Sequence, residues 1–215
     1  MPLIHKRNIR TDAVIGIWEV TETEEELLLL YPANAAELEK LNSYTHAFRR
    51  TQFLASRLLL HTLLPGVKII YDVNGKPFPD DENMHLSLSH SGKLIAMMTD
   101  SKHCGIDIET IRPKIEKIAS KFLSDEERAA CTEEPVAQRM HVYWCVKEAI
   151  YKVEGAKNVS LKSDIFVENV YNPVTGTVKA TLTHHGRSLS RNVYYEQFSD
   201  CMLAWTEQPA NESSL

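Results

Sequence analysis

The amino-acid sequence predicts an α+β fold made of two similar subdomains, each an antiparallel sheet packed with helices. Helix-type apolar periodicity gathers in two long segments, 35–64 and 136–154. Each of these segments is followed by short strand-like runs that turn residues separate. Helices followed by runs of strands favour an α+β architecture over a strictly alternating one. We therefore expect one subdomain over 1–102 and a second over 103–215.

In the first half, residues 13–20 (AVIGIWEV) have the composition of a strand. Thr21 and Thr23, followed by glutamates, predict the start of a helix. The helical pattern over 35–64 is expected to end at Pro65-Gly66. After this helix we expect a strand at 68–73, a tight turn at 74–75, and two further strands at 85–89 and 94–99.

The second half repeats this order. It is expected to begin with a strand at 105–109 and a helix at 115–122, and Ser124 ahead of three acidic residues predicts a further helix start. Residues 136–154 form the most regular helical pattern in the chain. The strands that we expect to follow lie at 165–170, 178–182, 192–198 and 202–205. Residues 208–215 are expected to be a frayed polar tail.

Composition and charge exclude several classes of protein. The formal net charge is −5, which argues against general nucleic-acid binding. No apolar run approaches the ~20 residues that cross a bilayer, so we expect no membrane association. Four scattered cysteines form no metal-binding pattern, and we expect reduced thiols in a cytoplasmic protein.

The segment Gly105-Ile106-Asp107-Ile108-Glu109 places two carboxylates on one face of a predicted strand. Two carboxylates on one face repel each other unless a cation lies between them, and hard oxygen ligands suit Mg²⁺ together with substrate phosphates. The alternative is a solvated strand face above a core of isoleucines. This segment alone does not decide between the two interpretations.

The helix over 136–154 carries a polar stripe. Trp144, Glu148 and Lys152 are spaced i, i+4, i+8 and share one face, while Lys147 and Tyr151 form the adjacent ridge. An ordinary ion-paired surface would have the same pattern. The aromatic side chains beside the charges are less typical of such a surface.

Two turns also carry polar groups. Ser89-His90-Ser91-Gly92 follows a strand of alternating leucines, and hydroxyls, an imidazole and free amides at a turn can hold phosphate oxygens. The alternative is that the serines bond their own turn. Asn74-Gly75-Lys76-Pro77 presents a lysine on a tight turn, which by itself indicates only a hairpin.

The order and spacing of these motifs are more specific than any one of them. GKP, SHSG, GIDIE, FLSDEE and WxxKEAxxK follow one another from Gly75 to Lys152. This series resembles the 4′-phosphopantetheinyl transferase superfamily, in its Sfp-type branch of two fused pseudo-symmetric halves. The clear match covers about residues 45–155. After Lys152 the chain reads Gly155-Ala156-Lys157-Asn158-Val159, which departs from the family's usual GxGL loop.

The resemblance implies a role for each matching residue. The magnesium ligands that it implies are Asp107, Glu109 and Glu148. The catalytic residues that it implies are Glu148, Lys152 and His90. The contacts to coenzyme A that it implies are Arg57, Gly75, Lys76, Ser89, His90, Lys147 and Lys152. The first subdomain would hold the adenine and 3′-phosphate, the second would hold Mg²⁺, and the active site would lie between them.

The resemblance also implies a reaction: transfer of the 4′-phosphopantetheine group of coenzyme A to a serine of an apo carrier protein, with release of 3′,5′-ADP. The carrier would be an acyl, peptidyl or aryl carrier domain, and a monomer with two pseudo-symmetric halves would suffice. Two other hypotheses remain. One is a non-catalytic carrier-binding module of the same fold, and the other is a magnesium-dependent hydrolase of coenzyme A or another nucleotide.

Overall fold

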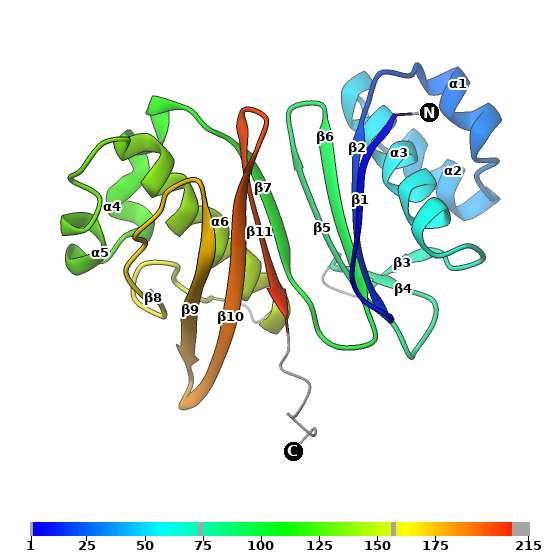
Figure 1. Cartoon of the computed structure of the whole chain (residues 1–215). Helices are drawn as coiled ribbons and strands as arrows, with labels where there is room; N and C mark the ends of the chain where they lie inside the picture. Colours follow the sequence, from blue (N-terminus) through cyan, green and yellow to red (C-terminus); the bar gives the residue numbers. More distant parts are fainter. Residues whose placement is uncertain (1, 73–74, 156–157, 208–215) are drawn as a thin grey trace. The chain divides into compact units, whose positions relative to one another are not determined.

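A computed structural model describes residues 2–72, 75–155 and 158–207 of the protein. The chain divides into two units, Met1–Ser101 and Lys102–Leu215, and each has its own antiparallel sheet with helices on it (Figure 1). The predicted α+β class is therefore confirmed. The predicted tail at 208–215 and half of the predicted turn at 74–75 lie outside the described residues. No helix in the described part of the chain is long and apolar enough to span a membrane.

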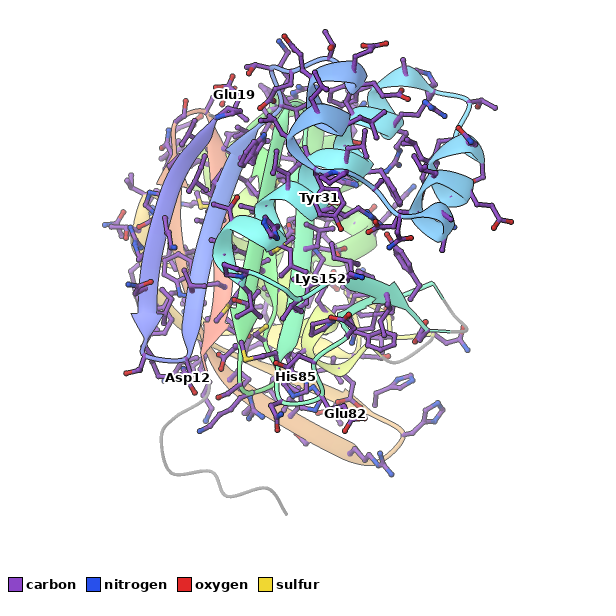
Figure 2. The ribbon with its side chains drawn as sticks, turned by 90° about the vertical axis from the view of Figure 1, so that its right-hand side faces the viewer. Asp12, Glu19, Tyr31, Glu82, His85 and Lys152 are labelled. Carbon is purple, nitrogen blue, oxygen red and sulfur yellow. The ribbon has the colours of Figure 1, made fainter. Side chains whose placement is uncertain are left out.

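The first unit contains a four-stranded antiparallel sheet in the order β1-β2-β6-β5 and a small β3-β4 pair. Its strands are β1 (Leu3–Arg10), β2 (Ala13–Glu19), β3 (Ile69–Tyr71), β4 (Pro77–Pro79), β5 (His85–Ser91) and β6 (Leu94–Asp100). Asp12 lies at the turn between β1 and β2, and Glu19 lies at the other end of β2 (Figure 2). Strands β1 and β4 were not predicted from the sequence.

Three helices lie on one face of this sheet: α1 (Glu24–Leu30), α2 (Ala35–Asn42) and α3 (Ala47–Leu63) (Figure 1). Thr23 forms the predicted capping box with Glu26 at the start of α1. The prediction of one helix over 35–64 was wrong, because the chain leaves helical geometry between α2 and α3. The Ser43 hydroxyl donates to the Lys40 carbonyl at 2.6 Å, and His46 is extended.

The second unit contains a five-stranded antiparallel sheet in the order β7-β11-β10-β9-β8. Its strands are β7 (Ile106–Thr110), β8 (Ile165–Val167), β9 (Thr175–His184), β10 (Arg187–Phe198) and β11 (Cys201–Glu207). Its helices are the 3₁₀ helix η1 (Pro113–Ile118), α4 (Ala119–Phe122), α5 (Asp125–Ala129) and α6 (Val136–Glu154). Ser124 and Glu127 form a capping box at the start of α5, as the sequence predicted.

Helix α6 is the centre of the second unit. Its predicted bounds are confirmed, and Gly155 ends it in the left-handed conformation with φ 63°. Val142, Val146 and Ile150 of this helix belong to one hydrophobic core with Val178 and Val193 of the sheet. A helix surrounded by core in this way gives rigid positions to the few polar side chains that it carries.

Candidate active site

Strand β7 approaches helix α6 unusually closely at its start. A Cβ atom at Gly105 would lie 1.9 Å from the carbonyl oxygen of Ala149, so only glycine fits there. The Gly105 N–H donates to the Thr206 hydroxyl at 2.8 Å, and the Thr206 N–H donates to the Gly105 carbonyl, also at 2.8 Å. Gly105 thus sets the distance between the strand that carries Asp107 and the helix that carries Glu148.

We expect Gly105→Ala to destabilise the protein by about 1–3 kcal/mol, because the new methyl group overpacks this contact. The measurement is urea unfolding followed by circular dichroism. Gly66→Ala is the matched control, since its Cβ would meet no atom within 4 Å and only the backbone strain at φ 90° remains. Equal losses in the two variants would show that the contact between β7 and α6 is not tight.

Both carboxylates of β7 are on the sheet face that α6 covers. Asp107 pairs with Ala204 and Glu109 pairs with Met202 on the neighbouring strand β11. Directly opposed residues of an antiparallel pair share a face, and Ala204 and Met202 both belong to the core around α6. The predicted shared face for Asp107 and Glu109 is confirmed. Asp107 is only 3% exposed, so the alternative of a solvated strand face does not hold for that residue.

Helix α6 brings a third carboxylate to this face. Trp144, Glu148 and Lys152 are half-buried, whereas most of the helix from Met140 to Val153 is fully buried. The stripe predicted from the i, i+4, i+8 spacing is therefore present. The Trp144 ring packs edge-on against Phe122, with centroids 5.0 Å apart.

The electrostatics of Glu148 indicate how close the three carboxylates are. The pKa of Glu148 is raised to about 7 by burial, the largest cause, and by the negative charges of Asp107 and Glu109, against the lowering effect of Lys152. Burial and the same two carboxylates raise the pKa of the Cys145 thiol well above its usual value. The pKa values of two separate groups on α6 thus respond to the charges of Asp107 and Glu109. The pKa of Glu148 is close to neutral pH, which is the value that suits a general base.

Lys152 supplies the cation of this cluster. Its Nζ donates to Oδ1 of Asp107 at 2.7 Å and to the Ile106 carbonyl at 3.0 Å. The structure therefore brings together four of the predicted site residues: Asp107, Glu109, Glu148 and Lys152. An ammonium group against Asp107 reduces the repulsion among the carboxylates.

The chemistry of this cluster fits Mg²⁺, because all three acidic groups offer hard oxygen ligands. Within residues 2–72, 75–155 and 158–207, no three His, Cys, Asp or Glu side chains already converge on one point that could hold a metal ion. Mg²⁺ usually takes only one or two protein carboxylates and completes its shell with phosphates and water. The cluster can provide those one or two carboxylates, so metal binding stays a prediction.

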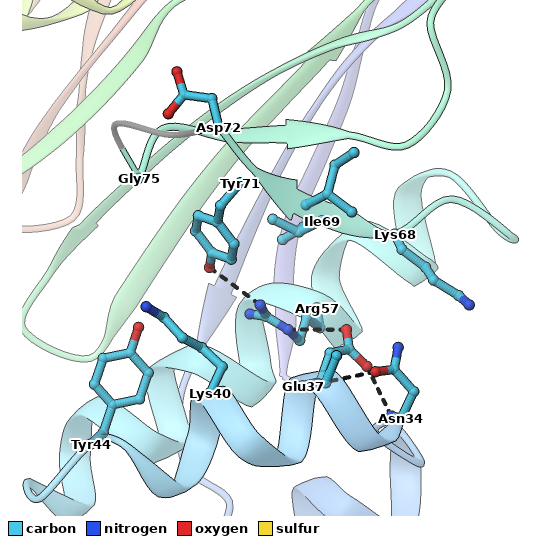
Figure 3. A pocket seen from close by; sticks show the side chains of 12 residues that line it. Asn34, Glu37, Lys40, Tyr44, Arg57, Lys68, Ile69, Tyr71, Asp72 and Gly75 are labelled. Atoms are coloured by element: carbon cyan, nitrogen blue, oxygen red, sulfur yellow. Dashed lines mark hydrogen bonds and ion pairs between the residues drawn. The ribbon is translucent and has the colours of Figure 1, made fainter.

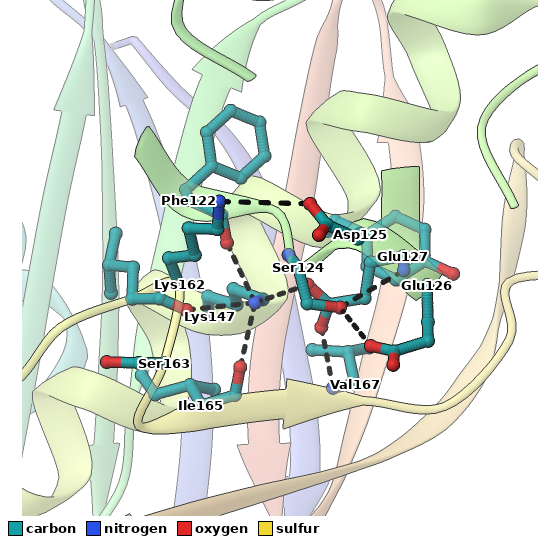
Figure 4. Close-up of polar contacts among 12 residues, drawn as sticks. Phe122, Ser124, Asp125, Glu126, Glu127, Lys147, Lys162, Ser163, Ile165 and Val167 are labelled. Atoms are coloured by element: carbon teal, nitrogen blue, oxygen red, sulfur yellow. Dashed lines mark hydrogen bonds and ion pairs between the residues drawn. The ribbon is translucent and has the colours of Figure 1, made fainter. Parts of the chain in front are cut away.

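The Lys147 side chain points into the core beside Glu127 and Ile165, as Figure 4 shows. Its predicted contact with coenzyme A is wrong for this structure, because the side chain is buried. The side chain is 0% exposed, and Nζ donates to the carboxylate of Glu127 at 2.6 Å. Three backbone carbonyls accept its other hydrogen bonds, those of Phe122, Leu161 and Ile165. The physical reason is helical rotation, since residues 147 and 148 differ by about 100° around the axis.

In the first unit, Arg57 and Gly75 both line one cavity of about 630 Å³, as Figure 3 shows. Arg57 lies on α3 and reaches the cavity between α2 and β3. Gly75 precedes β4, in a turn where Asp72 accepts the Gly75 N–H through its carbonyl and the Lys76 N–H through its carboxylate. Lys76 is exposed beside the cavity and is not among its lining residues.

Ser89 and His90 lie within β5 and not on a free turn. Ser89 pairs with Ala96 and His90 pairs with Ile95, so the expectation that these two residues form the turn after the strand was wrong. Ser89 is buried, and His90 is exposed beside a second cavity of about 90 Å³. Tyr44 and Tyr71 line both cavities of this unit.

The sequence reasoning missed one partner of His90. Arg49 lies with its Nη1 3.1 Å from His90 Nε2, and it lines the same small cavity. Arg49, Phe53 and Arg57 are spaced i, i+4, i+8 on α3, and this spacing could have identified the face. The neighbouring Arg50 instead donates to the carboxylate of Glu24 and to the Leu41 carbonyl.

Comparison with known proteins gives one consistent result. The family model described as the 4′-phosphopantetheinyl transferase superfamily matches residues 103–207. A 4′-phosphopantetheinyl transferase named ffp from Bacillus subtilis is 35% identical, over 75% of this chain and 76% of its own length. A second 4′-phosphopantetheinyl transferase from Bacillus subtilis is 31% identical, over 66% of this chain and 68% of its own length. The 4′-phosphopantetheinyl transferase AcpT of Escherichia coli K12 is 39% identical, over 50% of this chain and 59% of its own length.

Proposed function

This chain belongs to the 4′-phosphopantetheinyl transferase superfamily, and we propose that it transfers the phosphopantetheine arm of coenzyme A to a serine of an apo carrier protein. The family relationship supports the class of reaction. The geometry of each unit supports the roles of the individual residues.

The observation that most supports the proposal is the cluster of Asp107, Glu109 and Glu148 with Lys152. A serine hydroxyl is a weak nucleophile until a positioned base takes its proton, and a base works best when its pKa is near the working pH. Glu148, with a pKa of about 7, meets that requirement. The carboxylates of Asp107 and Glu109, beside it on β7, are the proposed ligands of Mg²⁺.

In the proposed step, the carrier serine oxygen forms a bond to the β-phosphorus of coenzyme A. The bond from that phosphorus to the bridging oxygen breaks, and 3′,5′-ADP leaves with the electron pair. Glu148 takes the proton of the serine, and Lys152 neutralises charge on the phosphates. Mg²⁺ bound at Asp107 and Glu109 would supply further neutralisation of the pyrophosphate.

The cavity of the first unit is the proposed site of the nucleotide half of coenzyme A. Its volume of about 630 Å³ lies within the usual range for ligand pockets, which is roughly 300–1,000 Å³. Tyrosine rings and lysine side chains line it, and these groups suit a purine base with a phosphate. His90 and Arg49, at the adjacent small cavity, are proposed to contact further phosphate oxygens.

One experiment separates this proposal from its two alternatives. The protein is incubated with coenzyme A, Mg²⁺ and a panel of apo acyl, peptidyl and aryl carrier proteins, and the carriers are weighed by mass spectrometry. We expect a mass gain of one phosphopantetheine on at least one carrier and an equal amount of 3′,5′-ADP. Hydrolysed coenzyme A without a carrier adduct would indicate a hydrolase, and no change in either would indicate a binding module.

A further inference from the structure

The pairing of β7 with β11 ends in an unusual hydrogen bond between Gly105 and Thr206. Opposed residues of an antiparallel pair that exchange hydrogen bonds usually donate each N–H to the carbonyl of the other. The Thr206 N–H follows this rule and donates to the Gly105 carbonyl at 2.8 Å. The Gly105 N–H donates instead to the Thr206 hydroxyl, also at 2.8 Å. A side chain therefore takes the place of a main-chain acceptor at the start of β7.

This hydrogen bond lies away from water. Gly105 is buried, and Thr206 is 1% exposed. The hydroxyl also lies 3.5 Å from the Gly105 carbonyl, to which it can donate its own hydrogen. Without the hydroxyl, the Gly105 N–H would lose this acceptor in a buried place, and a buried hydrogen bond is costly to leave unmade. The conformation of the chain at Gly105 thus depends on one hydroxyl group.

The start of β7 is also where Lys152 meets the strand. Its Nζ donates to the Ile106 carbonyl at 3.0 Å and to Oδ1 of Asp107 at 2.7 Å. The side chain of Lys152 is 24% exposed and that of Asp107 is 4% exposed, so the pair is largely shielded from water. Both acceptors of Lys152 belong to the two residues that follow Gly105. A shift of the backbone at Gly105 would therefore move both of them away from the ammonium group.

We propose that Thr206 is a positioning residue of the transfer site. Its hydroxyl fixes the start of β7, and the strand then holds the Ile106 carbonyl and the Asp107 carboxylate where Lys152 reaches both. This inference rests on the proposed function, because it concerns the carboxylate assigned there to Mg²⁺ and the lysine assigned to the phosphates. Metal ligands depend on the neighbours that orient them, and losing such a neighbour usually costs about 10- to 100-fold in metal affinity.

Chemical acetylation of the metal-free protein measures how firmly Lys152 is held. The wild type, Thr206→Val and Thr206→Ser are treated with a dilute acetylating reagent, and the rate at each lysine is followed by mass spectrometry of peptides. Valine has nearly the shape of threonine but no hydroxyl, whereas serine keeps the hydroxyl. We expect Lys152 to react about fivefold or more faster in Thr206→Val than in the other two proteins, because the strand no longer holds its acceptors. Exposed Lys162 is the internal reference and should react equally in all three.

Binding of Mn²⁺ in the presence of coenzyme A then shows whether this position matters to the metal centre. We expect the Kd of Mn²⁺ to be about tenfold higher in Thr206→Val and unchanged in Thr206→Ser. Thr99→Val is the matched control, because Thr99 is also 1% exposed on a strand and its hydroxyl has no partner in the part of the chain that the structure describes. Leu182→Ala controls for lost stability, since Leu182 is a core residue of β9, which two strands separate from β7. Both controls should bind Mn²⁺ as the wild type does.

Three results would overturn the proposal. Lys152 could be acetylated at the same rate in Thr206→Val as in the wild type, Thr206→Val could bind Mn²⁺ as tightly as the wild type, or Leu182→Ala could weaken Mn²⁺ binding as much as Thr206→Val does. Circular dichroism checks that each variant is folded, and Thr206→Ala, which also lacks the hydroxyl, replaces Thr206→Val if valine prevents folding. A wild type that binds no Mn²⁺ would contradict the proposed metal site, and the acetylation rates would still decide the role of Thr206. Failure of the inference and failure of the proposed function are therefore distinguishable.

Discussion

Replacing Glu148 by glutamine is expected to reduce the rate of phosphopantetheine transfer by about 10²- to 10⁴-fold, the usual contribution of a general base. Glutamine keeps the shape of the side chain but cannot accept the proton of the carrier serine. The measurement is the initial rate of carrier modification at saturating coenzyme A. Glu154→Gln, at an exposed position of the same helix, is the matched control and should have wild-type activity.

The same substitution is expected to stabilise the metal-free protein at alkaline pH. The pKa of Glu148 is about 7 in the folded chain, above its ordinary value of 4.5. The folded state therefore binds the proton more tightly than the unfolded state does. The resulting stabilisation is complete below pH 4.5 and is lost as pH rises through 7. Glutamine cannot ionise, so it avoids this loss.

The expected gain follows from the size of the shift. At pH 8, Glu148→Gln should have a free energy of unfolding up to about 3 kcal/mol above that of the wild type, and near pH 5 the gain should fall to about 1 kcal/mol or less. Urea unfolding in a buffer that contains a chelator measures both values. A variant with normal turnover and lower stability at pH 8 would mean that Glu148 is a structural residue and not the base.

Replacing Lys147 by methionine is expected to destabilise the protein by about 3–5 kcal/mol, because it leaves the buried carboxylate of Glu127 without its cation. Within the described part of the chain, Glu127 would keep the N–H groups of Ser124 and Val167 as its donors. Three backbone carbonyls would also lose the Nζ donor. Urea unfolding at pH 7 measures the loss, and Lys147→Met/Glu127→Gln should recover part of it because the uncompensated charge is removed.

This variant also tests the role that the sequence suggested for Lys147. If the side chain serves only the core, the KM for coenzyme A should change by less than about twofold at a temperature where the variant is folded. A KM about tenfold higher, with stability close to the wild type, would mean that Lys147 binds coenzyme A after all. Exposed Lys162, whose Nζ lies 3.9 Å from Asp125, is the control because its replacement should alter neither quantity.

Much of the fold could be predicted because its elements have strong local signals. The bounds of α6 followed from its apolar period and the glycine after it, and most strands followed from alternating residues between turn signals. Strand β1 had no such signal, because basic residues lie on both of its faces. Its apolar and polar residues therefore do not alternate as they do in the other strands. The segment between α2 and α3 contains no proline or glycine. The helical pattern of the sequence therefore continues through it, and the break was not predicted.

The site was predictable only in part, for a related reason. Asp107 with Glu109, and Trp144 with Glu148 and Lys152, share faces that strand and helix periods determine. The burial of Lys147 depends on Glu127 and on carbonyls up to 25 residues away in the chain, which no local pattern specifies. Arg49 beside His90 is likewise a tertiary contact between residues 41 apart.

Binding of a divalent ion tests the central claim most directly, namely that Asp107 and Glu109 hold the metal of the transfer reaction beside the base Glu148. Mn²⁺, as a substitute for Mg²⁺, is titrated into the protein with coenzyme A present, and free Mn²⁺ is followed by electron paramagnetic resonance. Asp107→Asn removes a carboxylate of the cluster, and Asp12→Asn removes an exposed one on the first unit. We expect one tight site in the wild type and in Asp12→Asn, and at least about tenfold weaker binding in Asp107→Asn. Equal binding by all three proteins would contradict the claim.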